Sequence, residues 1–219
     1  MHRATAIFAC TLLALGWLMP VGARAQGERT VDFRLDVVPL LERKSCSTAA
    51  CHGGATGRGG FKLSLFGSDP LADYRAIALE GAGRRIDVAE PEASLVLRKA
   101  TKRYDHGGGR VLRRDEPAYA MLRAWIAAGA PPPCDERPLV RLRLQLDAAR
   151  LEAFAIVEGR EERVTDRAHF FSSDDAVVRV LDEGASCKVE VREPGEHWVF
   201  ARYAGALARL RLVRPFDAA

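Results

Sequence analysis

The chain has 219 residues, of which 48% are hydrophobic and 28% charged, a composition typical of a globular protein with one or two small domains. Its formal net charge is only +4, and acidic and basic residues are interspersed without a long basic run. We therefore expect no nucleic-acid partner, because such binding depends on concentrated positive charge.

The first 25 residues have the features of an export signal. His2 and Arg3 precede an apolar stretch, Ala4–Gly22, and Ala23–Ala25 supplies the small-x-small pattern that signal peptidase cleaves. The stretch is nearly long enough to cross a bilayer, so an uncleaved anchor is the alternative. Pro20 and the cleavage pattern favour removal, which predicts a periplasmic or cell-envelope protein without a stable transmembrane segment.

Three consecutive prolines, Pro131–Pro133, divide the rest of the chain, because they cannot continue a helix. We predict a helical domain over residues 30–130, a Pro-rich linker over 131–137 and a strand-rich domain over 138–215. The expected fold is therefore multidomain α + β, in which a small all-α domain precedes an antiparallel β-sandwich.

The helical domain contains three predicted helices, at Asp36–Arg43, Ser94–Lys99 and Ala118–Ala128. The last is the clearest, with Gly129 as its natural C-cap. Its apolar stripe consists of Met121, Leu122, Trp125 and Ile126.

The strand-rich domain changes to a period of two residues, which is typical of half-buried strands. Turn signals at residues 182–184, 193–195 and 204–205 separate the runs, and Trp198 is expected in the core of the sandwich. The predicted strands are Val140–Leu146, Ala176–Leu181, Lys188–Val191, His197–Tyr203 and Leu207–Val213.

Cys46, Cys51 and His52 form the most informative motif. A haem c is held by two cysteine thioethers and by the histidine that follows the second cysteine, and two residues usually separate the cysteines. Here four residues separate them, a minority variant that requires the chain to bulge before His52. The alternatives are a disulfide, a zinc site that lacks a second ligand pair, and a catalytic cysteine. We expect one covalent haem c.

The residues after His52 suit such a cofactor. Five glycines lie within the next eight residues, where the backbone must pass close to a flat macrocycle. The apolar side chains Phe61, Leu63, Leu65 and Phe66 follow, and we expect them to exclude water from the porphyrin.

The sixth iron position has three candidate occupants. His106 lies in a Gly-rich loop before the last helix, and Met121 lies on the apolar face of that helix. The third is an open or water-bound position. We favour His106, and two imidazoles give a lower reduction potential than a histidine and a methionine.

The stretch Val38–Pro131 resembles planctomycete-type cytochrome c domains. This resemblance implies a helical cytochrome c fold, and it places His106 in the loop where many cytochrome c domains carry their distal methionine. The matching motifs are Cys46-x4-Cys51-His52-Gly53, Gly59–Gly67, Asp69-Pro70, Asp73-Tyr74, Arg84-Arg85, Pro91-Glu92-x-Ser94-Leu95, His106–Gly108 and Leu122-x2-Trp125-Ile126-x2-Gly129-Ala130.

The stretch Pro138–Val213 resembles bacterial immunoglobulin-like domains, which often follow such cytochrome domains. The matching stretches are Val164–Asp166, Phe171–Val177 and Pro194–Tyr203. A disulfide between Cys134 and Cys187 is compatible with this sequence, but nothing in the sequence fixes their separation.

These features leave three functions open. The first is a periplasmic electron-transfer protein without catalytic activity, whose redox partners are unknown. The second is an interaction protein whose immunoglobulin-like domain binds a cell-envelope partner or polymer. The third is a haem enzyme or ligand sensor with an open iron position. Lys62, Arg84 and Arg85 are candidates for a docking surface or for pairing with haem propionates, with a solvated face as the alternative.

Overall fold

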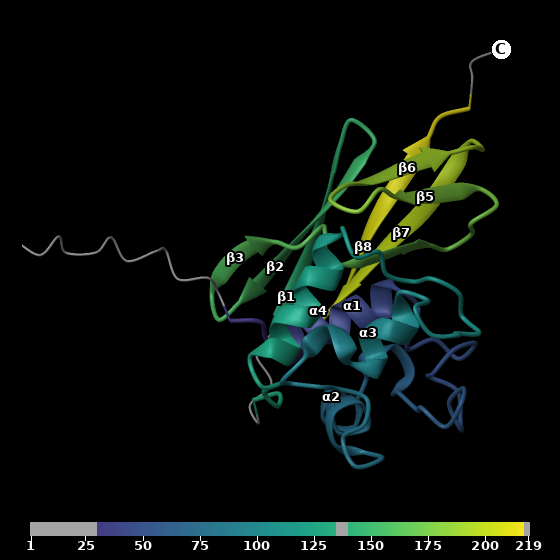
Figure 1. Cartoon of the computed structure of the whole chain (residues 1–219). Helices are drawn as coiled ribbons and strands as arrows, with labels where there is room; N and C mark the ends of the chain where they lie inside the picture. The colour runs from purple at the N-terminus through teal and green to yellow at the C-terminus, as the bar shows by residue number, and fades with distance from the viewer. Residues whose placement is uncertain (1–29, 135–139, 217–219) are drawn as a thin grey trace, which may run out of the picture.

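A computed structural model describes residues 30–134 and 140–216, which form a helical part and a strand part (Figure 1). The predicted export signal and the end of the predicted linker lie outside the described residues. None of the helices within these ranges has the length and apolar character that a bilayer crossing requires.

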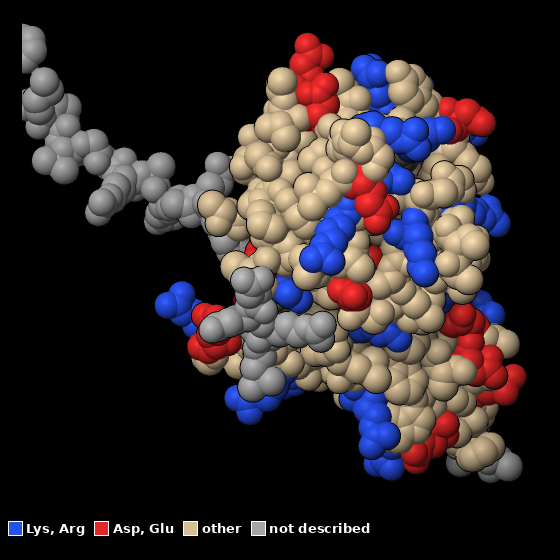
Figure 2. Space-filling model, turned by 90° about the horizontal axis from the view of Figure 1, so that it is seen from below, with Lys and Arg blue, Asp and Glu red and all other residues tan. Residues whose placement is uncertain are grey.

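The helical part consists of short elements joined by turns. They are η1 (Phe33–Val37), α1 (Val38–Arg43), η2 (Leu65–Gly67), α2 (Pro70–Tyr74), η3 (Arg75–Leu79), η4 (Pro91–Ala93), α3 (Leu95–Ala100) and α4 (Pro117–Ala127). All three predicted helices are present, with small shifts at their ends. Seen from below in Figure 2, acidic and basic side chains are interspersed over this face rather than gathered by sign.

Helix α4 supplies the centre of the helical core. Trp125 and Ile126 are fully buried, and the Trp125 ring lies 5.3 Å from that of Phe33 in η1. Tyr74 meets Phe33 edge-on at 5.6 Å. Gly129 follows the helix with a φ of 91°, the left-handed conformation that the predicted C-cap requires. The packing of the aromatic rings therefore holds the first and last helices together.

The strand part is a pair of antiparallel sheets. One has the order β1-β2-β6-β5 with β3 paired to β2, and the other has the order β4-β7-β8. The strands are β1 (Val140–Asp147), β2 (Arg150–Val157), β3 (Arg160–Arg163), β4 (His169–Ser172), β5 (Val178–Asp182), β6 (Cys187–Val191), β7 (Gly195–Tyr203) and β8 (Ala206–Arg214). The predicted helix-plus-sandwich layout is confirmed at this level.

Two details of the strand part differ from expectation. The sequence did not predict β2, β3 or β4. Trp198 is only half-buried, and the Arg209 guanidinium stacks on its ring at 4.9 Å. The alternation along β7 instead turns Val199, Ala201 and Tyr203 into the core, so the predicted two-residue period is confirmed and the predicted core position of Trp198 is wrong.

The two parts meet along η1 and α1 through buried polar contacts. Glu42 accepts a 2.7 Å hydrogen bond from Arg202 of β7, and Asp36 pairs with Arg167 at 3.1 Å. The Tyr203 hydroxyl donates to the Leu35 carbonyl at 2.8 Å. Both carboxylates are about 2% exposed, so the arginines of the strand part compensate charges that the helical part buries.

Candidate functional site

The segment from Cys46 to His52 forms a tight turn that begins three residues after α1. The His52 amide donates to the Cys46 carbonyl at 3.0 Å, and the Gly53 amide donates to Thr48 at 2.9 Å. The residues between the two cysteines are thus folded into a bulge, as the wide spacing requires. A Cβ atom at Gly53 would lie 2.1 Å from the Ser47 carbonyl oxygen, so only glycine fits.

The sequence predicts that the glycines after His52 make room for a flat macrocycle, but the structure gives Gly53 and Gly57 a different role. At Gly57, φ is 67° and an added Cβ would lie 2.2 Å from the Phe61 carbonyl oxygen. Gly53 and Gly57 therefore serve close contacts within the chain's own backbone. These contacts tighten the loop that carries His52.

His52 and His106 lie opposite each other although they come from different loops. Their ring centroids are 6.2 Å apart and their planes differ by 15°. The Nδ1 atom of His52 is 2.9 Å from the Phe61 carbonyl oxygen, and that of His106 is 2.8 Å from the Gly109 carbonyl oxygen. Because a carbonyl only accepts, both Nδ1 atoms carry the proton, and each ring keeps Nε2 as the nitrogen available to a metal.

The protonation of His52 suits a metal ligand. Burial lowers the pKa of His52, and electrostatic interactions with His106 and Arg58 lower it further, while hydrogen bonds to the Phe61 and Arg58 carbonyls oppose this effect. The neutral imidazole, which is the form that binds metals, is therefore favoured at neutral pH.

The centroid separation of the two rings matches, in distance alone, that of two imidazoles bound to one metal ion. With metal–nitrogen distances of about 2 Å and ring centres about 1 Å farther out, two imidazoles on opposite sides of one ion have centroids about 6 Å apart. Within the described residues, no three His, Cys, Asp or Glu side chains are grouped to hold a metal ion. Two imidazoles are too few for zinc, whereas haem iron needs only axial ligands from the protein.

The two cysteines of the motif are free thiols, as are Cys134 and Cys187. Cys46 packs against the helical core, and burial together with the nearby Cys51 raises its pKa to about 11. Its Sγ lies 3.7 Å from the Lys44 carbonyl oxygen. The disulfide considered between Cys134 and Cys187 is not formed in the structure, where Cys134 is exposed and Cys187 is buried.

Phe61 and Arg85 support the loop beneath His52. The Phe61 ring lies 4.7 Å from the His52 ring, and the Arg85 guanidinium stacks on Phe61 at 4.9 Å. Arg85 donates to the Ala76 carbonyl at 2.7 Å and to the Gly60 carbonyl at 3.3 Å. Arg85 is only 8% exposed, so it cannot belong to the expected docking surface, whereas Lys62 and Arg84 are exposed. Sequence reasoning missed this structural role because an Arg-Arg pair carries no signal of burial.

The four apolar residues expected around the cofactor divide into two groups. Phe61 contacts His52, and Leu63 is 1% exposed in the core with its amide bonded to the His52 carbonyl at 2.8 Å. Leu65 is 43% exposed and Phe66 is 39% exposed. The Arg202 guanidinium stacks on Phe66 at 4.5 Å, so Phe66 belongs to the contact between the two parts rather than to the histidine pair.

Met121 packs against the helical core, as expected of a residue on the apolar face of α4. A cavity of about 500 Å³ borders the Gly53-Gly54 turn and reaches Asp73, but neither His52 nor His106 lines it. The histidine pair is therefore the arrangement in the described residues best suited to hold a cofactor. No protein-family model matches the chain, and no curated protein matches it.

Proposed function

We propose that this protein is an exported c-type cytochrome that holds one covalent haem and transfers electrons. The observation that carries the proposal is the pair of nearly parallel imidazoles of His52 and His106, whose ring centroids are 6.2 Å apart. Two further observations support the same conclusion. Cys46 and Cys51 lie in the turn before His52, and the sequence resembles planctomycete-type cytochrome c domains. The strand part is proposed to be immunoglobulin-like.

In this proposal the haem supplies a one-electron iron couple. Cys46 and Cys51 would hold it through thioether bonds, and His52 and His106 would bind its iron. Each Nδ1–H donates to a backbone carbonyl, which fixes the ring orientation and makes Nε2 more basic. Two histidines lower the reduction potential relative to a histidine and a methionine.

A distal position occupied by His106 would favour electron transfer over catalysis or ligand sensing, both of which need an open coordination site. The His106 ring is only half-buried, and its loop contains three consecutive glycines. The 2.8 Å bond to the Gly109 carbonyl nevertheless orients the ring within its loop, which supports the assignment of His106 as a ligand.

The test is the visible spectrum of the protein produced with the cytochrome c maturation machinery. We expect covalent haem with a six-coordinate, low-spin spectrum in both oxidation states, and conversion of His106→Ala to high spin with uptake of carbon monoxide. His197→Ala and Met121→Leu are matched controls, because His197 lies in β7 and Met121 packs in the helical core, and both should keep the wild-type spectrum.

Two results would contradict the proposal. Absence of covalent haem, with Cys46→Ser and Cys51→Ser behaving like the wild type, would refute haem attachment. A low-spin His106→Ala spectrum together with a high-spin Met121→Leu spectrum would assign the distal position to the methionine. Electron paramagnetic resonance adds an independent measurement, because parallel imidazole planes split the iron orbitals and give a rhombic low-spin signal.

A further inference from the structure

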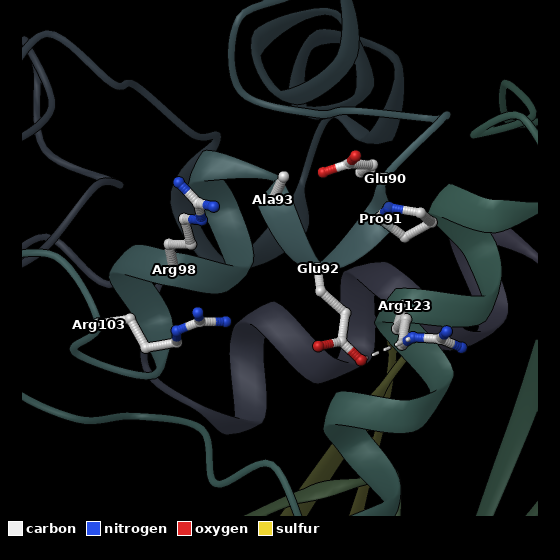
Figure 3. Close-up of a pocket in the computed structure, with 7 residues that line it drawn as sticks. All are labelled: Glu90, Pro91, Glu92, Ala93, Arg98, Arg103 and Arg123. Carbon is white, nitrogen blue, oxygen red and sulfur yellow. Dashed lines mark ion pairs between the residues drawn. The ribbon is translucent and has the colours of Figure 1, made fainter.

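A second cavity lies in the helical part, between η4, α3 and α4, and its walls are rich in arginine. Its volume is about 360 Å³, at the lower end of the range of small-molecule sites. Arg98 and Arg103 line one side, Arg123 of α4 lines the other, and Glu90 and Glu92 of the η4 segment complete the walls (Figure 3). Neither His52 nor His106 lines this cavity.

The two glutamates of the cavity do not pair with all three of its arginines. Glu92 pairs with Arg123 at 3.3 Å, and its other carboxylate oxygen accepts a short hydrogen bond from Arg114. Both carboxylate oxygens of Glu92 are therefore engaged by Arg123 and Arg114. In the described part of the chain, the Arg103 guanidinium has no hydrogen-bond or ion-pair partner, and in Figure 3 it points into the cavity.

Arg98 retains unused hydrogen-bonding capacity beside Arg103. Its guanidinium stacks on the Tyr104 ring at 5.1 Å and donates once, to the Tyr104 hydroxyl at 2.6 Å. Its Nε is buried and donates to no acceptor among the described residues. A buried donor without an acceptor is costly, and the Arg103 guanidinium on the same cavity also lacks an acceptor among the described residues.

We propose that this cavity binds a small, multiply charged oxyanion through Arg98 and Arg103. Guanidinium groups present paired N–H donors that match the oxygens of phosphate and carboxylate groups, and two such groups facing one cavity favour a ligand with more than one negative charge. The Glu90 carboxylate should weaken anion binding, because it lines the same cavity and has no cationic partner among the described residues.

The experiment is calorimetric titration of the full mature protein with inorganic phosphate and, separately, with citrate, at constant ionic strength and with chloride as the reference anion. We expect saturable binding at one site with a Kd of about 1 mM or tighter for at least one of the two anions. Binding of phosphate alone assigns a phosphate ligand, and binding of citrate alone assigns a polycarboxylate. Absence of saturable binding by both overturns the proposal.

Three variants test the residues. Arg103→Gln should weaken binding about tenfold, because a charge-assisted contact is lost, and Glu90→Gln should tighten it about threefold. Arg179→Gln is the matched control, since Arg179 is exposed on β5 without a partner in the described residues. Equal affinities in all three variants would show that the anion binds elsewhere.

A spectroscopic measurement locates the ligand independently of affinity. Arginine side-chain Nε–Hε resonances in ¹⁵N-labelled protein should shift for Arg98 and Arg103 on titration and stay in place for Arg179. Shifts that spread over all arginines would indicate a general ionic effect and refute the site. Because none of these measurements uses haem, they are independent of the proposed electron transfer.

Discussion

Replacement of Arg202 by methionine probes the contact between the two parts of the protein. Arg202 pairs with Glu42 at 2.7 Å, and the Glu42 side chain is 3% exposed while that of Arg202 is 24% exposed. Removing one partner of a buried ion pair costs about 3–5 kcal/mol, because the remaining charge is left without compensation. The partial exposure of Arg202 places our expectation at the lower end, about 3 kcal/mol at pH 7. Methionine retains apolar bulk over the Phe66 ring, so the loss reports mainly the charge.

The loss of stability caused by Arg202→Met should depend on pH. Burial already raises the pKa of Glu42, against the hydrogen bond and charge of Arg202, which lower it. Without Arg202 the pKa rises further, and protonation removes the buried charge. For a carboxyl whose pKa is raised by folding, stability is present at low pH and lost as the pH rises through the folded pKa. The cost of Arg202→Met should therefore be smaller at pH 5 than at pH 7.

The assay is urea denaturation followed by circular dichroism and by tryptophan fluorescence, since Trp125 lies in the helical part and Trp198 in the strand part. Glu42→Gln serves as the second arm of a double-mutant cycle, in which the coupling energy should be about 2 kcal/mol. A loss below about 1 kcal/mol at pH 7, or the same loss in the Glu42→Gln background, would refute the role assigned to this pair.

Three other substitutions follow from single positions. Burial raises the pKa of Asp73 to about 6. As the pH rises from about 4 to about 7, the free energy of unfolding of the wild type should therefore fall by about 2 kcal/mol relative to that of Asp73→Asn. Urea denaturation measures this difference, and parallel pH profiles of the two proteins would contradict it. A Cβ at Gly108 would lie 2.9 Å from Cε1 of His106, so in the proposed haem protein Gly108→Ala should reduce the low-spin fraction of the visible spectrum, whereas Gly107→Ala, with open space, should not. Arg85→Gln should lower the free energy of unfolding by about 2 kcal/mol, because buried carbonyls lose their donor, and an unchanged urea midpoint would exclude this role.

Local periodicity was sufficient where apolar side chains are large. Helix α4 was predicted within one residue at each end, because Leu122, Trp125 and Ile126 form an unbroken stripe. Strand β2 was missed because its inward positions include Ala153 and Ala155, which contribute little hydrophobic contrast. The residues of the turn before β2 do not indicate a hairpin either. Both central residues, Ala148 and Ala149, have positive φ angles of 43° and 70°, which glycine or asparagine usually adopts.

The candidate site depends on contacts that no local pattern encodes. The motif predicted His52, but its pairing with His106 rested on the Gly-rich loop and on a family resemblance rather than on spacing. In the structure each ring is oriented by a bond to a backbone carbonyl, that of Phe61 or of Gly109, and residue type does not reveal such acceptors. The burial of Arg85 is likewise a tertiary property, because only the folded chain places three carbonyl acceptors, those of Ala76, Glu80 and Gly60, around its guanidinium.

The contact between the two parts involves the helix that precedes the cysteine turn. Helix α1 carries Glu42 and Arg43 on the surface that meets the strand part, and Arg43 binds Asp182 through two hydrogen bonds, one of them 2.8 Å long. The Cys46 amide then donates to the Leu41 carbonyl at 2.8 Å, so the turn that carries the motif is attached to the same helix. The strand part thus contacts α1 from one side, and the helical core packs on Leu40 and Leu41 of the same helix. Because the chain passes from α1 into the cysteine turn, these contacts hold the helix from which the segment leading to His52 starts.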